Sequence, residues 1–65
     1  MIVMKVKGTK DTYLGDFDEW CGKFLPVRVR GIQRARQFKS SKECYEAFVL
    51  ARCKQFLNLY EEVEL

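Results

Sequence analysis

The chain has 65 residues, a formal net charge of +3, no histidine, and three cysteines at Cys21, Cys44 and Cys53. A chain of this length forms one domain, here residues 1–65, and its core is thin because it buries only about 60% of the surface of its unfolded chain. The odd cysteine count, the absence of a C-x-x-C pair and the lack of histidine argue against a disulfide framework and the usual zinc sites, so we expect free thiols and no metal.

The N-terminal part of the chain predicts a β-hairpin. Residues 2–7, IVMKVK, alternate as in a half-buried strand, so we expect one face to be buried and to carry Ile2, Met4 and Val6. We expect the opposite face to be exposed and to carry Val3, Lys5 and Lys7. GTKD, residues 8–11, is typical of a turn, and TYLGDF, residues 12–17, suits a returning strand.

DFDEWCGKF, residues 16–24, has the signals of a short helix. Asp16 can cap it, and Glu19 follows three positions later. The apolar residues recur with the i, i+3, i+4, i+7 spacing of one helical face: Phe17, Trp20, Cys21 and Phe24. Gly22 disfavours a helix, so a single turn or an ordered loop is the alternative, and Pro26 ends the segment in either case.

PVRVRGIQRARQF, residues 26–38, begins as a strand. All four of its arginines fall on even positions, and Arg28 and Arg30 alternate with Val27 and Val29. Gly31 interrupts this alternation and predicts a bulge or a turn. In one unbroken strand Phe38 would share the arginine face, whereas a bulge at Gly31, or helical structure after it, would return Phe38 to the core.

The strongest local signal predicts a helix over residues 41–57. Ser40 or Ser41 precedes Glu43 as in an S-x-x-E capping box, in which side chains satisfy the free amides at a helix start. No residue up to Leu57 breaks the helix, and Asn58 suits a left-handed stop.

The last residues, 59–65, favour a strand over a frayed continuation of the helix, because Val63 and Leu65 alternate with glutamates. The predicted fold is therefore α+β: a small antiparallel sheet packed on one long C-terminal helix, in the order β-β-(α)-β-α-β.

The predicted long helix has two apolar faces, and one thin sheet can cover only one of them. We therefore expect a homodimer formed through this helix, with an interface made of Tyr45, Val49, Cys53, Phe56, Leu57 and Tyr60. Two alternatives stay open. The short helix at residues 17–24 could close a monomer by folding over the long one, or the second face could be a groove for a foreign partner.

Basic residues are concentrated in the middle of the chain. Residues 26–54 hold eight basic and two acidic residues, a net charge of +6, whereas residues 55–65 carry three glutamates. The candidate binding residues for phosphate or carboxylate groups are Arg28, Arg30, Arg34, Arg36 and Lys39. A solvated strand face, whose charges discourage edge-to-edge pairing, explains the same residues and leaves room for ion pairs with the acidic tail.

The sequence argues against catalysis. Without histidine, acid–base chemistry would fall to carboxylates that so short a chain can hardly bury, and DFDE is more simply a set of acids at a helix start. No glycine-rich phosphate loop is present, and we expect no cofactor. No apolar run suits a signal peptide or a membrane span, so we expect a cytoplasmic protein.

From ARQFKSSKECYEAF onward, the chain resembles the small accessory proteins carried by phages and prophages. The residues that carry the resemblance are Ala35, Phe38, the Ser40–Ser41 pair, Glu43 and Ala47. The arginine-rich strand departs from that pattern. The resemblance implies a non-enzymatic protein that binds and disables a host factor, as anti-CRISPR proteins do, or sequesters a nucleotide signal through its arginines and nearby aromatic residues.

We therefore expect a small binding protein, a phage counter-defence factor that inhibits a host protein or sequesters a nucleotide. The alternative is a nucleic-acid-binding accessory protein that uses the arginine-rich strand from Arg28 to Arg36. Its binding would weaken steeply with salt, because phosphate contacts would dominate it.

Overall fold

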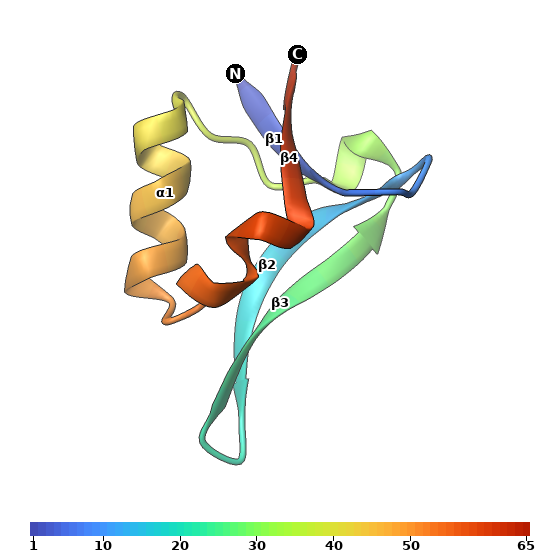
Figure 1. Ribbon diagram of the computed structural model, residues 1–65. Coiled ribbons are helices and arrows are strands. Elements are labelled where there is room, and N and C mark those ends of the chain that lie inside the picture. The colour runs from blue at the N-terminus through green and yellow to red at the C-terminus, as the bar shows by residue number, and fades with distance from the viewer.

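The chain folds into a four-stranded antiparallel sheet, one α-helix and two 3₁₀ helices (Figure 1), and the structure, a computed structural model, describes residues 1–65. In chain order the elements are β1 (Ile2–Val6), β2 (Thr12–Trp20), β3 (Lys23–Arg30), η1 (Ile32–Arg34), α1 (Ser41–Leu50), η2 (Lys54–Leu59) and β4 (Tyr60–Glu64). The sheet order is β3-β2-β1-β4. The α+β class is confirmed, but the prediction of a long C-terminal helix is wrong, because α1 is short and lies mid-chain.

Strand β1 is buried on both faces. It pairs along its whole length with β4, from Ile2 opposite Glu64 to Val6 opposite Tyr60. As the alternation predicts, one face joins the main core, which consists of Ile2, Met4, Val6, Leu14, Phe38, Cys44, Phe48, Cys53 and Tyr60. The prediction that Val3 is exposed is wrong, because it packs with two other buried residues in a second cluster, Val3, Tyr13 and Ala35.

Strand β2 bends at Gly15, where one extra residue shifts its register with β3 between Leu14 and Asp16. Glycine suits this β-bulge because a Cβ at position 15 would overlap the side chain of Val29. Beyond the bulge, β2 leaves β1 and continues with β3 as a two-stranded arm that projects from the rest of the molecule (Figure 1). We call residues 16–27 the β2–β3 arm.

The predicted short helix over residues 16–24 is wrong, because these residues form the end of β2, a two-residue turn and the start of β3. Trp20 and Lys23 pair across the turn, and its central residues, Cys21 and Gly22, have φ angles of 51° and 78°. Positive φ at both central residues is what a type I′ turn requires, and the twist of that turn matches the flanking strands. The helical spacing of the apolar residues does not mark one buried face, since Trp20 is exposed.

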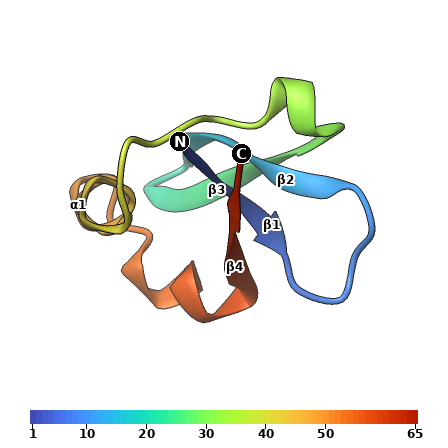
Figure 2. The same ribbon diagram turned by 90° about the horizontal axis from the view of Figure 1, so that it is seen from above.

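The segment after Gly31 returns Phe38 to the core, as the helical alternative predicts. Phe38 is fully buried, and two backbone hydrogen bonds of 2.8 Å join it to Ile2. Between Gly31 and Phe38, Ala35 follows η1 and packs with Val3 and Tyr13 in the second cluster. Viewed from above, α1 and the turn at residues 32–34 lie on different sides of the molecule (Figure 2), so both sheet faces are partly covered.

Helix α1 begins where the capping box predicts. Ser40 is the N-cap, and its Oγ accepts a hydrogen bond of 3.2 Å from the backbone N–H of Glu43. Ser41 Oγ then donates a hydrogen bond of 2.6 Å to Glu62 Oε1. The first turn of α1 is therefore tied to β4.

Helix α1 ends after Leu50 in a Schellman motif. Arg52 adopts a left-handed φ of 59°, and its N–H donates to the carbonyl of Val49, while the N–H of Cys53 donates to that of Phe48. The chain reverses at this point, so Cys53 and then η2 pack onto the main core. The second apolar face of the predicted helix does not form, because most of its residues fold back onto the sheet.

Strand β4 confirms the strand predicted within residues 59–65, but it lies beside β1 and not beside β3. Glu61 consequently pairs with Lys5, at 3.9 Å between Nζ and Oε1. The ion pairs that were open to the acidic tail and the arginine strand do not form, because the two strands are not neighbours. Neither α1 nor the two 3₁₀ helices combine the length and apolar character that spanning a bilayer demands.

Candidate functional site

The five basic residues predicted as a binding surface are dispersed over several elements. They are Arg28 and Arg30 on β3, Arg34 in η1, Arg36 in the segment after it, and Lys39 just before α1. All five are exposed. The alternation that suggested one basic row stops at Gly31, where the chain leaves the sheet, and only Arg28 and Arg30 stay on one strand face.

Arg28 lies beside the main core. It pairs with Leu14, which places its side chain on the sheet face that carries the core. Burial raises the pKa of Tyr60, and the nearby guanidinium of Arg28 partly opposes that rise. Charged residues together with Pro26 on an edge strand are typical of protection against edge-to-edge pairing.

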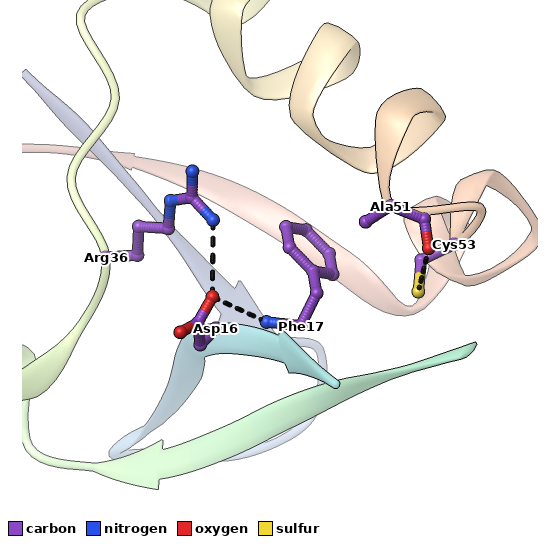
Figure 3. Close-up of polar contacts among 5 residues, drawn as sticks. All are labelled: Asp16, Phe17, Arg36, Ala51 and Cys53. Atoms are coloured by element: carbon purple, nitrogen blue, oxygen red, sulfur yellow. Dashed lines mark hydrogen bonds and ion pairs between the residues drawn. The ribbon is translucent and has the colours of Figure 1, made fainter. Parts of the chain in front are cut away.

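Arg36 is fixed by contacts with three side chains. Its Nη1 lies 3.4 Å from Asp16 Oδ1, and its guanidinium carbon lies 5.6 Å from the ring centroid of Phe17 and 5.3 Å from that of Phe38. Figure 3 shows the guanidinium beside Asp16, with the Phe17 side chain next to them on β2. The same Asp16 oxygen accepts a hydrogen bond of 2.8 Å from the N–H of Phe17.

A groove of about 510 Å³ lies next to this ion pair, between α1 and β2. We call it the α1–β2 groove, and its lining is Asp16, Phe17, Arg36, Glu43, Glu46, Ala47, Leu50 and Ala51. Phe17 is held in place by an edge-to-face contact with Phe48, at 5.0 Å between ring centroids. Half of the lining is thus apolar, and the other half is charged.

The charges of the α1–β2 groove are unbalanced. Three carboxylates line it against a single guanidinium, although the whole chain is cationic. The two ion pairs of the structure are Lys5–Glu61 and Arg36–Asp16, so Glu43 and Glu46 have no cationic partner. The groove therefore has a local net charge of −2, which favours a positively charged ligand.

The outer face of α1 forms a second, smaller hollow of about 360 Å³, lined by Tyr45, Glu46, Val49 and Leu50. Leu50 is 85% exposed, the highest value among the exposed large apolar residues, whereas Tyr45 and Val49 are exposed by 45% and 43%. Lys54 Nζ lies 5.7 Å from the ring centroid of Tyr45. Glu46 and Leu50 line both hollows, which therefore form one continuous surface, here named the α1 surface.

The six residues predicted as a dimer interface are divided between this surface and the core. Cys53 and Tyr60 are buried in the main core, and Phe56 and Leu57 are half-buried against it. Tyr45 and Val49 alone remain on the α1 surface. The chain itself thus covers most of the apolar area from which the homodimer was inferred, and the homodimer stays a prediction.

Sequence reasoning missed the groove, although part of its signal was present. Glu43, Glu46, Ala47 and Leu50 have the i, i+3, i+4, i+7 spacing of one helical face. Asp16 and Arg36 could not be assigned to the groove, because the bulge and the segment after η1 bring them together. The exposed apolar face of the β2–β3 arm was also missed, and it carries Trp20, Leu25 and Val27.

The cysteines are free thiols, as expected, with Cys21 exposed and Cys44 and Cys53 buried. Burial raises the pKa of Cys44 to about 11, and the negative charge of Glu62 adds to the rise. Burial also raises the pKa of Cys53. No three cysteine or carboxylate side chains converge as a set of metal ligands.

No protein-family model matches this chain, and no match was found among the curated proteins or among the solved structures.

Proposed function

We propose that this protein acts by binding another protein through the α1 surface, without catalysing a reaction. One observation carries the proposal: Leu50 is 85% exposed on the ridge that separates two adjoining hollows. An exposed leucine alone needs no explanation, but contiguous apolar side chains beside a hollow are typical of interaction sites. Here Tyr45 and Val49 extend the apolar area on one side, and Phe17, Ala47 and Ala51 extend it on the other.

The dispersion of the arginines favours a protein partner over a nucleotide or a nucleic acid. Arg36 is engaged with Asp16 and two aromatic rings, and Arg34 lies on a different element from Arg28 and Arg30. Two arginines on an edge strand give a weaker phosphate-binding surface than the four-residue row expected from the sequence. The nucleotide and nucleic-acid alternatives therefore become outcomes of the test.

The resemblance to phage-encoded accessory proteins supports a host protein as the partner. We propose that this host protein is inhibited when the α1 surface binds to it. Such inhibition requires only a rigid surface, which α1 supplies because both of its ends are fixed, by Ser40 at the start and by the Schellman motif at the end. The proposal places the protein in the cytoplasm, where its three free thiols stay reduced.

The proposal is tested by affinity capture from host lysate with three baits: the wild type, Leu50→Asp, and Arg28→Glu combined with Arg30→Glu. We expect a protein that the wild type and the arginine variant retain at high salt and that Leu50→Asp loses. Leu50 is exposed, so the aspartate leaves the core intact, and circular dichroism verifies folding. Retention by Leu50→Asp together with loss by the arginine variant would overturn the proposal in favour of the nucleic-acid alternative.

A second copy of the chain is the competing occupant of the α1 surface. Light scattering on the wild type and on Leu50→Asp distinguishes the two cases. A mass near 7.7 kDa for both proteins supports a foreign partner. A doubled mass for the wild type that returns to 7.7 kDa in the variant assigns the surface to the predicted homodimer.

A further inference from the structure

We infer that the α1–β2 groove receives an arginine side chain of the protein partner; this inference rests on the proposed function and names the chemistry of the contact. The groove combines an apolar wall, formed by Phe17, Ala47 and Ala51, with carboxylates at Glu43 and Glu46. A long basic side chain matches this combination, because its methylene stem packs on apolar groups while its charged end reaches the acids.

The unpaired carboxylates decide the charge of the occupant. Glu43 and Glu46 are one turn apart on α1, so their Cβ atoms are about 5–6 Å apart. Neither carboxylate forms an ion pair within the chain. Arg36 is the one basic residue of the groove lining, and the other eleven basic residues of the chain lie outside it. An incoming cation therefore replaces the solvation of two carboxylates by a charge-assisted contact, and an incoming anion would be repelled.

The spacing of the two carboxylates favours a guanidinium over an ammonium group. A guanidinium carries five N–H donors in a planar fork and can donate to two separate carboxylates at once, whereas an ammonium is a compact point charge. Arg36 already places its guanidinium among Asp16, Phe17 and Phe38 at one wall of the groove. The partner's guanidinium would extend this array toward α1.

The α1–β2 groove has room for a long side chain such as arginine. Its volume is about 510 Å³, and the lining comes from β2, the segment at Arg36, α1 and Ala51 just after α1. Leu50 borders both hollows. When the partner's arginine occupies the groove, the apolar residues next to that arginine would therefore contact the outer face of α1.

The inference is tested with N-acetyl-L-arginine N-methylamide as the probe, titrated into the whole ¹⁵N-labelled protein and followed by two-dimensional NMR. We expect saturable shifts at the amides of Phe17, Glu43, Ala47 and Leu50. The matching citrulline derivative has the same shape without the charge, and we expect at least about tenfold weaker binding from it, as the loss of a charge-assisted contact implies. The lysine derivative should bind with intermediate strength.

Two double variants serve as a matched pair. Glu43→Gln with Glu46→Gln should weaken binding of the arginine probe about tenfold, since both charge-assisted contacts are lost. Glu19→Gln with Glu64→Gln removes the same charge from exposed positions outside the groove lining and should change the affinity less than about twofold, because distant exposed charges are screened. The NMR spectrum of each variant shows directly whether it is folded.

Equal shifts from the citrulline derivative, unchanged affinity in Glu43→Gln with Glu46→Gln, or no saturable shift would each overturn the inference. So would groove shifts that depend on protein concentration without any probe, because they would assign the groove to a second copy of the chain. If the protein still captures its partner and Leu50→Asp abolishes that capture, the proposed function stands and only the inferred arginine contact is rejected.

Discussion

Arg36 and Asp16 form an ion pair at one wall of the α1–β2 groove, with 3.4 Å between Nη1 and Oδ1. Both side chains are well exposed, so this pair contributes at most about 1 kcal/mol to folding. Its larger effect is on charge, because it neutralises one of the three carboxylates of the groove.

Arg36→Met keeps an apolar stem and removes that neutralising charge. We expect the free energy of unfolding to fall by less than about 1 kcal/mol, as measured by urea denaturation. We also expect the arginine probe to bind a few-fold more tightly, because the net charge of the lining becomes more negative. Arg34→Met, which removes an arginine outside the groove, is the control, and an equal gain in affinity there would contradict the local effect.

Phe48 and Val49 are neighbours with opposite environments. Phe48 is fully buried and contacts Phe17 and Tyr60 edge to face, whereas Val49 is on the outer face of α1. Phe48→Ala should cost about 3–5 kcal/mol, and Val49→Ala less than about 0.5 kcal/mol, both measured by urea denaturation. A similar loss of unfolding free energy in the two variants would mean that α1 packs on the sheet with a face other than the one that carries Phe48.

The turn of the β2–β3 arm has a cysteine where asparagine is preferred. Cys21 has a φ of 51°, and asparagine tolerates this left-handed conformation better while forming the Asn-Gly pair of type I′ turns. Cys21→Asn should raise the free energy of unfolding by about 0.5–1 kcal/mol. Cys21→Ser should leave it nearly unchanged. A loss of stability in Cys21→Asn would contradict the turn type.

The three thiols should differ in reactivity. In native protein at neutral pH, a thiol-specific reagent should modify Cys21 and leave Cys44 and Cys53 protected until the chain unfolds. Mass spectrometry after brief labelling checks this, and Cys21→Ser should then show no rapid modification. Rapid labelling of Cys44 in the folded protein would contradict its burial in the core.

Burial of Cys44 also makes stability depend on alkaline pH. The pKa of this thiol rises from 9.0 to about 11 on folding, so its neutral form is favoured in the folded state. Its contribution is fully present below about pH 9 and is lost as the pH rises through about 11. Urea denaturation across this range should show a decline that is shallower in Cys44→Ala. An identical slope in the two proteins would contradict the assignment.

The predictable parts of the fold are those fixed by local chemistry. The N-terminal hairpin, the serine cap at Ser40 and the last strand follow from alternation, turn residues and a capping box, which act within a few residues. The sequence left two places open for Phe38, and the structure buries it because the strand ends at Arg30 and η1 follows Gly31.

The parts that could not be predicted depend on long-range packing. Arg52 takes the left-handed position that usually selects glycine, so no residue inside the predicted helix signals its end. The apolar residues at 16–24 have helical spacing, yet this segment forms the end of β2, a turn and the start of β3. The two strands pair with each other, and Cys21 and Gly22 adopt the positive φ angles that the turn requires. The groove is lined by Asp16, Arg36 and α1, which are far apart in the sequence. The bulge at Gly15 and the segment after η1 bring them together.

Photo-crosslinking in cells that produce the protein tests the central claim most directly. Benzoylphenylalanine replaces Leu50 on the α1 surface in one variant and Ile32 on η1 in another, and both positions are exposed. We predict that position 50 yields one discrete crosslinked protein, that position 32 does not, and that Tyr45→Asp diminishes the product. A discrete product from position 32 and none from position 50 would contradict the assignment of binding to α1.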